Sequence, residues 1–195
     1  MSRLTKPIPV VHQGRSNDCG PCSVAMASNF YLREPISRHD VAYDIRMWRV
    51  PGLKATMTPG IAQGLRKRGL IAKGGWFGRL STLKAHVDAD HPVIVLIRPT
   101  DLVGVHFLAL HYRVVVGYND SPTLPGGGEL YFNCSAALPV EEEGDRPGNV
   151  VVSFARFRRQ WLTWTSVNWH MAVCAGSPGA GSPGKECLGP RSLDG

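Results

Sequence analysis

The chain has 195 residues, five cysteines and a formal net charge of +7 at neutral pH. This length suits one domain with its own hydrophobic core, and the odd, irregularly spaced cysteines do not indicate a disulfide framework. No apolar run reaches the ~20 residues of a membrane-spanning helix, and the N-terminus lacks the apolar segment of a secretory signal. We therefore expect a soluble, cytoplasmic protein without membrane insertion.

The basic charge raises the question of nucleic-acid binding. Two basic clusters occur, at residues 66–68 and 156–159. Other basic residues are dispersed, and no recognised nucleic-acid motif accompanies them. These clusters are interpreted as solvated helix faces, and no nucleic-acid partner is predicted.

Apolar residues recur at helical spacing in the first half of the chain. Pro35 separates the first two helical segments, and Ser37 is a suitable N-cap for the second. Pro59 is typical of a first helical turn, whereas Gly69 is typical of a helix end. The predicted helices cover residues 20–32, 37–49, 58–69 and 81–87.

The second half of the chain changes to the pattern of β-strands. Strands are predicted at residues 92–97, 111–118, 129–134, 150–152 and 169–174, with a short helix at 154–161. Helices first and an antiparallel sheet second make an α+β arrangement. Residues 175–195 are rich in Gly, Ser and Pro, so we expect a domain at 1–174 and a disordered tail at 175–195.

The turn before the first predicted helix carries a chemical signal. Cys19 lies at the helix N-terminus, where unpaired backbone N–H groups and the helix dipole favour a thiolate and lower the thiol pKa. Acyl transfer also needs a base and donors for the oxyanion. Gln13, six residues earlier, can turn its amide back beside the sulfur. His111 begins an apolar strand and can present its imidazole at the sheet edge.

The pattern Gln13-x5-Cys19-Gly20-Pro21, with HYRVVVGY at residues 111–118, resembles the bacteriocin-processing family of papain-like cysteine peptidases, the double-glycine leader peptidases. The resemblance covers about residues 10–173. It implies a papain-like α+β fold, a peptide or protein substrate, and no cofactor or metal. It also implies that Cys19 is the nucleophile, His111 the general base and then acid, and Gln13 the oxyanion-hole donor.

The third catalytic position departs from the family pattern. Family members usually have an aspartate near the end of the strand that follows the histidine strand, and this sequence has Asn133 and Cys134 there. Register places Cys134 at the aspartate position, but Asn133 can orient an imidazole as asparagine does in papain-like enzymes. Neighbouring strand residues face opposite sides, so both cannot reach His111. Asn133 is the predicted orienting residue.

Two alternatives concern the base and the activity. His106 is a rival base, five residues before His111, and this spacing places it on the other face of a continuous strand. The missing aspartate also permits a second function, in which the same fold binds peptides with weak or no catalysis. An imidazole without an orienting partner would be a poor base.

Two further alternatives concern the thiols. Cys19-Gly20-Pro21-Cys22 matches the thioredoxin motif and would make the chain a dithiol oxidoreductase, although a polar loop precedes it instead of a buried strand. A zinc site could combine Cys19 and Cys22 with Cys134 and His111, but the ligand spacing is unlike that of a compact zinc module.

Overall fold

The computed structural model describes residues 1–50, 55–99, 110–136 and 147–176. The described helices are α1 (Cys19–Asn29), α2 (Arg38–Asp44), the 3-10 turn η1 (Arg46–Trp48), α3 (Thr58–Arg66), α4 (Leu80–Asp88) and α5 (Phe154–Trp161). The described strands are β1 (Ser2–Arg3), β2 (Arg49–Val50), β3 (Ala55–Thr56), β4 (Ile71–Gly75), β5 (Val93–Ile97), β6 (His111–Asp120), β7 (Gly128–Asn133), β8 (Val150–Ser153) and β9 (His170–Cys174).

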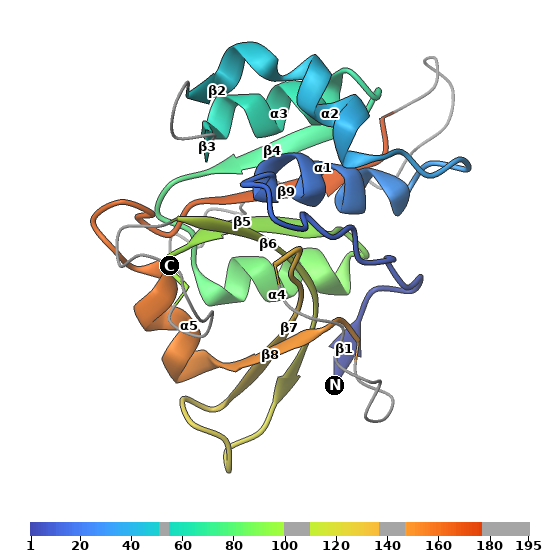
Figure 1. Cartoon of the computed structure of the whole chain (residues 1–195). Coiled ribbons are helices and arrows are strands. Elements are labelled where there is room, and N and C mark those ends of the chain that lie inside the picture. Colours follow the sequence, from blue (N-terminus) through green and yellow to red (C-terminus); the bar gives the residue numbers. More distant parts are fainter. Residues whose placement is uncertain (51–54, 100–109, 137–146, 177–195) are drawn as a thin grey trace.

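Within the described ranges, one antiparallel sheet has the strand order β4-β9-β5-β6-β7-β8, with β1 paired to β6. A separate hairpin joins β2 and β3. Helices α1 to α3 cover one face of the sheet, and α4 and α5 lie on the other (Figure 1). The predicted combination of N-terminal helices with an antiparallel sheet is confirmed.

The alternation of side chains along β5 explains why this strand lies in the middle of the protein. Ile94 and Leu96 join the core beneath α1, α2 and α3, whereas Val93, Val95 and Ile97 join the core beneath α4 and α5. All five side chains are therefore buried, which accounts for a continuous apolar run instead of an alternating one.

The prediction misses the short strands β1 and β3, and two of its other errors have a clear physical cause. The predicted helix at 37–49 ends at Asp44, because Ile45 leaves the helical conformation and the chain continues through η1 into β2. The sequence pattern also missed β4, which lies among the N-terminal helices and pairs with β9. β4 contains Gly74, where a side chain would come within 2.2 Å of the His170 carbonyl oxygen, so the strand lacks the apolar alternation that identifies strands.

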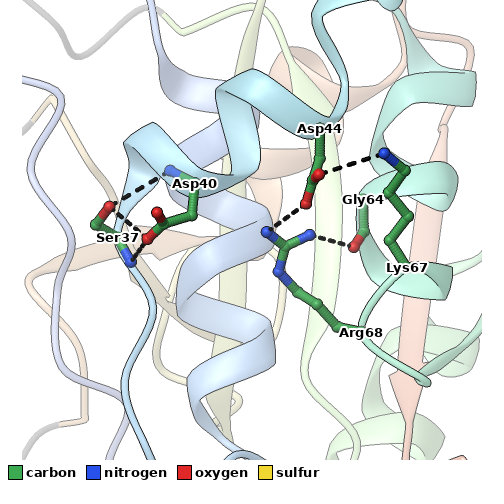
Figure 2. Close-up of polar contacts among 6 residues, drawn as sticks. All are labelled: Ser37, Asp40, Asp44, Gly64, Lys67 and Arg68. Carbon is green, nitrogen blue, oxygen red and sulfur yellow. Dashed lines mark hydrogen bonds and ion pairs between the residues drawn. The ribbon is translucent and has the colours of Figure 1, made fainter.

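Polar contacts fix α2 against α3, the two helices that pack beside α1. The Ser37 hydroxyl and the Asp40 carboxylate form a capping box at the start of α2. At the other end of α2, Asp44 pairs with Lys67 at 3.3 Å and with Arg68 at 3.0 Å (Figure 2). Arg68 also donates to the Gly64 carbonyl oxygen at 2.7 Å. The Arg68 side chain is only 9% exposed, so Asp44 neutralises a nearly buried charge.

We expect Asp44→Ala to lower the free energy of unfolding by about 1 to 2 kcal/mol, because Arg68 would keep a largely buried charge without its carboxylate. Urea unfolding at neutral pH measures the change. Lys67→Ala is the matched control, and its effect should stay below about 0.5 kcal/mol because Lys67 is well exposed. Equal effects of the two substitutions would contradict this assignment.

None of the helices in the described ranges has both the length and the apolar character needed to cross a membrane. The predicted tail lies outside the described residues from residue 177 onward.

Candidate active site

Cys19 is the first residue of α1, and Pro21 occupies the first turn, where a missing N–H leaves no hydrogen bond unmade. The Cys22 N–H donates to the Asp18 carbonyl oxygen at 2.8 Å. Residues 20–28 are all buried, so the helix extends from the site into the core between the sheet and helices α2 and α3. The sequence therefore places a thiol on a rigid, deeply anchored helix end.

Ionic contacts hold the loop that leads into Cys19. The Asp18 carboxylate lies 2.6 Å from Arg49 and 4.0 Å from Arg38. Arg38 also donates to the His12 carbonyl oxygen at 2.6 Å. Burial opposes ionisation of Asp18, but hydrogen bonds from Ser16 and Arg49 and the two arginine charges outweigh it and lower its pKa. Asp18 is therefore a stable anion that ties the loop to α2 and β2.

The thiol of Cys19 lies against the beginning of β6. The backbone N–H groups of Tyr112 and Gly20 point to its sulfur. The Tyr112 hydroxyl donates to the Thr56 carbonyl oxygen at 3.0 Å, and a side chain at Gly20 would collide with Thr56 at 2.6 Å. This close fit brings the nucleophile candidate next to the strand that starts with His111.

The His111 imidazole is buried, with 5% of the residue exposed. Its Nε2 lies 3.3 Å from the Sγ of Cys134, which is fully buried just beyond β7. Asn133, the predicted orienting residue, has a different contact: its Nδ2 donates to the Ile8 carbonyl oxygen at 2.7 Å. The two side chains diverge because neighbouring residues of an extended segment face opposite sides. The contact with the imidazole belongs to Cys134.

The same segment holds Gln13. The Gln13 N–H donates to the Ser135 carbonyl oxygen at 3.0 Å, and the Ser135 hydroxyl donates to Gln13 Oε1 at 2.9 Å. With its oxygen engaged, the carboxamide presents Nε2 as its donor. Sequence reasoning missed Ser135, although its place directly after the Asn133-Cys134 pair was a usable signal.

Burial raises the pKa of the Cys19 thiol, and the backbone N–H groups of Tyr112 and Gly20 only partly oppose this effect. The sequence predicted a lowered pKa from the helix N-terminus, and that prediction is wrong. The depth of the thiol decides the direction, because loss of hydration disfavours the charged form. Burial likewise raises the pKa of Cys22 to about 12.

We expect alkylation of Cys19 by iodoacetamide to accelerate with pH and to keep rising above pH 9.0, the ordinary thiol value. The rate should rise with pH because only the thiolate reacts, and a raised pKa leaves little thiolate at neutral pH. Mass spectrometry of the Cys19 peptide across the pH range gives the rate. A plateau already reached at neutral pH would show a preformed thiolate and contradict the prediction.

The structure bears on the alternatives. Within the ranges that the structure describes, Cys19, Cys22 and Cys134 are free thiols. Among the described residues, no group of three or more His, Cys, Asp or Glu side chains is arranged to hold a metal ion. A loop precedes Cys19, whereas a thioredoxin-like dithiol follows a buried strand. The rival base His106 lies outside the described residues.

A model of the family described as Peptidase_C39 like matches residues 5–165 of this chain. The chain belongs to the Peptidase_C39-like family. A comparison with curated proteins finds no match. The family membership agrees with the resemblance seen around Gln13, Cys19 and His111 in the sequence.

Solved structures show that this C39-like chain has the papain-like fold of C39 peptidases. A C39-like peptidase from Bacillus anthracis aligns with a TM-score of 0.62 at 13% identity, covering 91% of this chain and 99% of that one. The double glycine motif protease of an AMS/PCAT transporter, solved with its leader peptide, has a TM-score of 0.54 at 18% identity, covering 89% and 96%. The peptidase domain of Streptococcus ComA, a bifunctional ABC transporter, has a TM-score of 0.54 at 20% identity with the same coverage.

Proposed function

We propose that this protein is a cysteine peptidase, or a related acyl transferase that cleaves amide bonds, and that it acts on a peptide or protein substrate. The observation that carries the proposal is the convergence at the end of β7. Cys134 contacts the imidazole of His111, and Ser135 positions the carboxamide of Gln13. Base and oxyanion donor are thus set by adjacent residues, beside the helix end that carries Cys19.

In the proposed reaction, the Cys19 sulfur attacks the carbonyl carbon of the scissile amide while its proton passes to His111. The Cys19 N–H and Gln13 Nε2 donate to the oxyanion that forms. His111 returns the proton to the leaving amine, which departs as the thioester forms. Water then attacks the thioester, with His111 as base, and releases the acid and the free thiol. Because the resting thiol is protonated, proton removal by His111 accompanies the attack.

Cys134 has the orienting role in this proposal, in place of the predicted Asn133. With Nε2 against the Cys134 sulfur, proton exchange with Cys19 is assigned to Nδ1. The contact with the Cys134 sulfur fixes the direction of the ring, but a thiol stabilises an imidazolium less than a carboxylate does. The Cys134 contact therefore sets the geometry of the ring, but it supplies less stabilisation of the imidazolium than an aspartate at this position would.

We expect Cys134→Asp to raise kcat by about tenfold, since a carboxylate would stabilise the imidazolium that forms during attack. Cys134→Ala should lower kcat by about tenfold through loss of ring orientation. Steady-state kinetics with pH profiles test both changes. The acid limb of the Asp variant should lie at higher pH than that of the wild type, because the carboxylate also favours the protonated imidazole in the free enzyme, where it cannot act as a base. A change in KM alone would show that Cys134 acts on substrate binding instead.

Digestion of an unbiased peptide mixture, followed by mass spectrometry of new termini, tests the proposed function. The wild type should produce new termini, and Cys19→Ala should produce none. Cys22→Ala is the matched control, because its buried thiol lies outside the proposed chemistry. Equal cleavage by wild type and Cys19→Ala would overturn the proposal.

A second candidate function is peptide binding without turnover. Two observations favour it: a thiol stands at the orienting position, and burial raises the pKa of Cys19. In that case the chain would retain a peptide through affinity selection, the bound peptide would stay intact, and Cys19→Ser would not weaken binding.

A further inference from the structure

Two neighbouring loops expose large apolar side chains. The loop from β4 to α4 carries Trp76 and Phe77, which are 47% and 78% exposed. The loop from α5 to β9 carries Leu162 and Trp164, which are 67% and 82% exposed. These four residues are named the apolar loop patch. Isolated exposed apolar residues are ordinary, but a group on adjoining loops marks an interaction surface.

Hydrogen bonds join the two loops into one unit. The Phe77 N–H donates to the Val167 carbonyl oxygen at 2.9 Å, and the Gly78 N–H donates to the Asn168 carbonyl oxygen at 3.1 Å. The Asn168 side chain returns a bond to the Gly78 carbonyl oxygen at 3.0 Å. In Figure 1 the orange segment between α5 and β9 lies at the left of the view, on the side where β4 leads to α4.

The backbone of this unit is strained. Phe77, Val167 and Asn168 have φ angles of 63°, 38° and 52°. Side chains other than glycine disfavour this left-handed region, most strongly when they are bulky or β-branched. Such conformations persist where the surroundings impose them, and they concentrate at sites of function. Here the strained turn carries the well-exposed ring of Phe77.

The two segments that carry the patch have charges of one sign. Residues 71–87 and 147–176 contain no Asp or Glu. Arg79 follows Phe77 closely, and Arg158 and Arg159 lie four and three positions before Leu162, on the same exposed side of the α5 end. In the part of the chain that the structure describes, these three arginines form no ion pair.

We propose that the apolar loop patch and its three arginines form a docking surface for an anionic lipid membrane. Trp, Phe and Leu side chains enter the boundary between headgroups and acyl chains, and arginines bind anionic headgroups. Single-stranded nucleic acid could stack on the aromatic rings, but it would gain little from Leu162. The combination of aliphatic and aromatic side chains with arginines that form no ion pair within the described ranges favours lipid.

The patch lies at the same end of the strands as the candidate active site. His170 follows the second loop and pairs with Gly75 of β4 and Val95 of β5. β5 ends at Ile97, which pairs with His111 of β6. When the protein docks on a membrane, this end of the sheet would face the membrane surface. The inference concerns the binding surface and does not rest on the proposed peptidase function.

Vesicle flotation with the full chain tests the proposal. We expect binding to vesicles of equal parts phosphatidylcholine and phosphatidylglycerol, little binding to phosphatidylcholine alone, and weaker binding as salt rises. Two double variants should each weaken binding by about tenfold or more: Leu162→Ser/Trp164→Ser and Arg158→Glu/Arg159→Glu. Matched controls are Met47→Ser, which removes an apolar side chain 73% exposed on η1, and Arg33→Glu, an exposed cation elsewhere.

Circular dichroism and thermal unfolding establish that each variant is folded. A folded variant of the patch that binds anionic vesicles as the wild type does would overturn the proposal. So would the absence of binding by the wild type, or equal losses in the two controls. Tighter binding to a single-stranded oligonucleotide than to anionic vesicles would assign the surface to nucleic acid and also overturn it.

Discussion

Replacement of His111 with alanine is expected to lower kcat/KM by about a thousandfold, because the thiol would lose the group that removes its proton and later protonates the leaving amine. The expected loss is large because burial raises the pKa of Cys19, so little thiolate exists without a base. Steady-state kinetics on the peptide found in the digestion experiment measure the change.

His39→Ala is the matched control, because His39 lies on the exposed side of α2. It should leave kcat/KM unchanged. Alkylation of Cys19 at neutral pH should also slow in His111→Ala. Retention of most activity in the His111 variant would transfer the role of the base to another residue, such as His106.

Replacement of Gln13 with alanine is expected to lower kcat by about a hundredfold to a thousandfold with little change in KM, because the amide donates to an oxyanion that exists only in the transition state. Gln13→Glu should be at least as severe, since it removes the donor and places a negative charge near the oxyanion. Pre-steady-state kinetics can show that formation of the thioester is the slowed step.

Two variants separate this role from loop structure. Ser135→Ala removes the hydroxyl that holds Gln13 Oε1 and should cause a smaller loss, of about tenfold. Asn17→Ala changes an exposed residue of the same loop and should have no effect. A rise in KM with unchanged kcat in Gln13→Ala would place the residue in ground-state substrate binding instead.

The parts of the fold that could be predicted are those with strong local signals. Pro21 and the apolar run after it predicted α1, and the Val-rich segments predicted β5 and β6. β4 had no such signal, because Gly74 and Gly75 occupy an edge strand whose pairing depends on contact with β9. The end of α2 at Asp44 was also missed, since the helical spacing of apolar residues continued to Trp48.

The candidate site also has parts that the sequence predicted and parts that it did not. Spacing and family resemblance pointed to Gln13, Cys19 and His111, and the structure gathers them around the end of β7 and the start of β6. The choice between Asn133 and Cys134 depends on which way an extended segment faces, which a single sequence does not specify. The direction of the Cys19 pKa shift depends on burial, and burial comes from tertiary packing.

A covalent intermediate on Cys19 tests the central claim most directly. Rapid acid quenching during turnover of a cleaved peptide, followed by mass spectrometry of the intact protein and of the Cys19 peptide, would detect the thioester. The proposed mechanism predicts an acyl group of the N-terminal product's mass on Cys19, absent in Cys19→Ala and accumulating less in His111→Ala. Turnover with no acyl group on Cys19, or with the group on another residue, would contradict it.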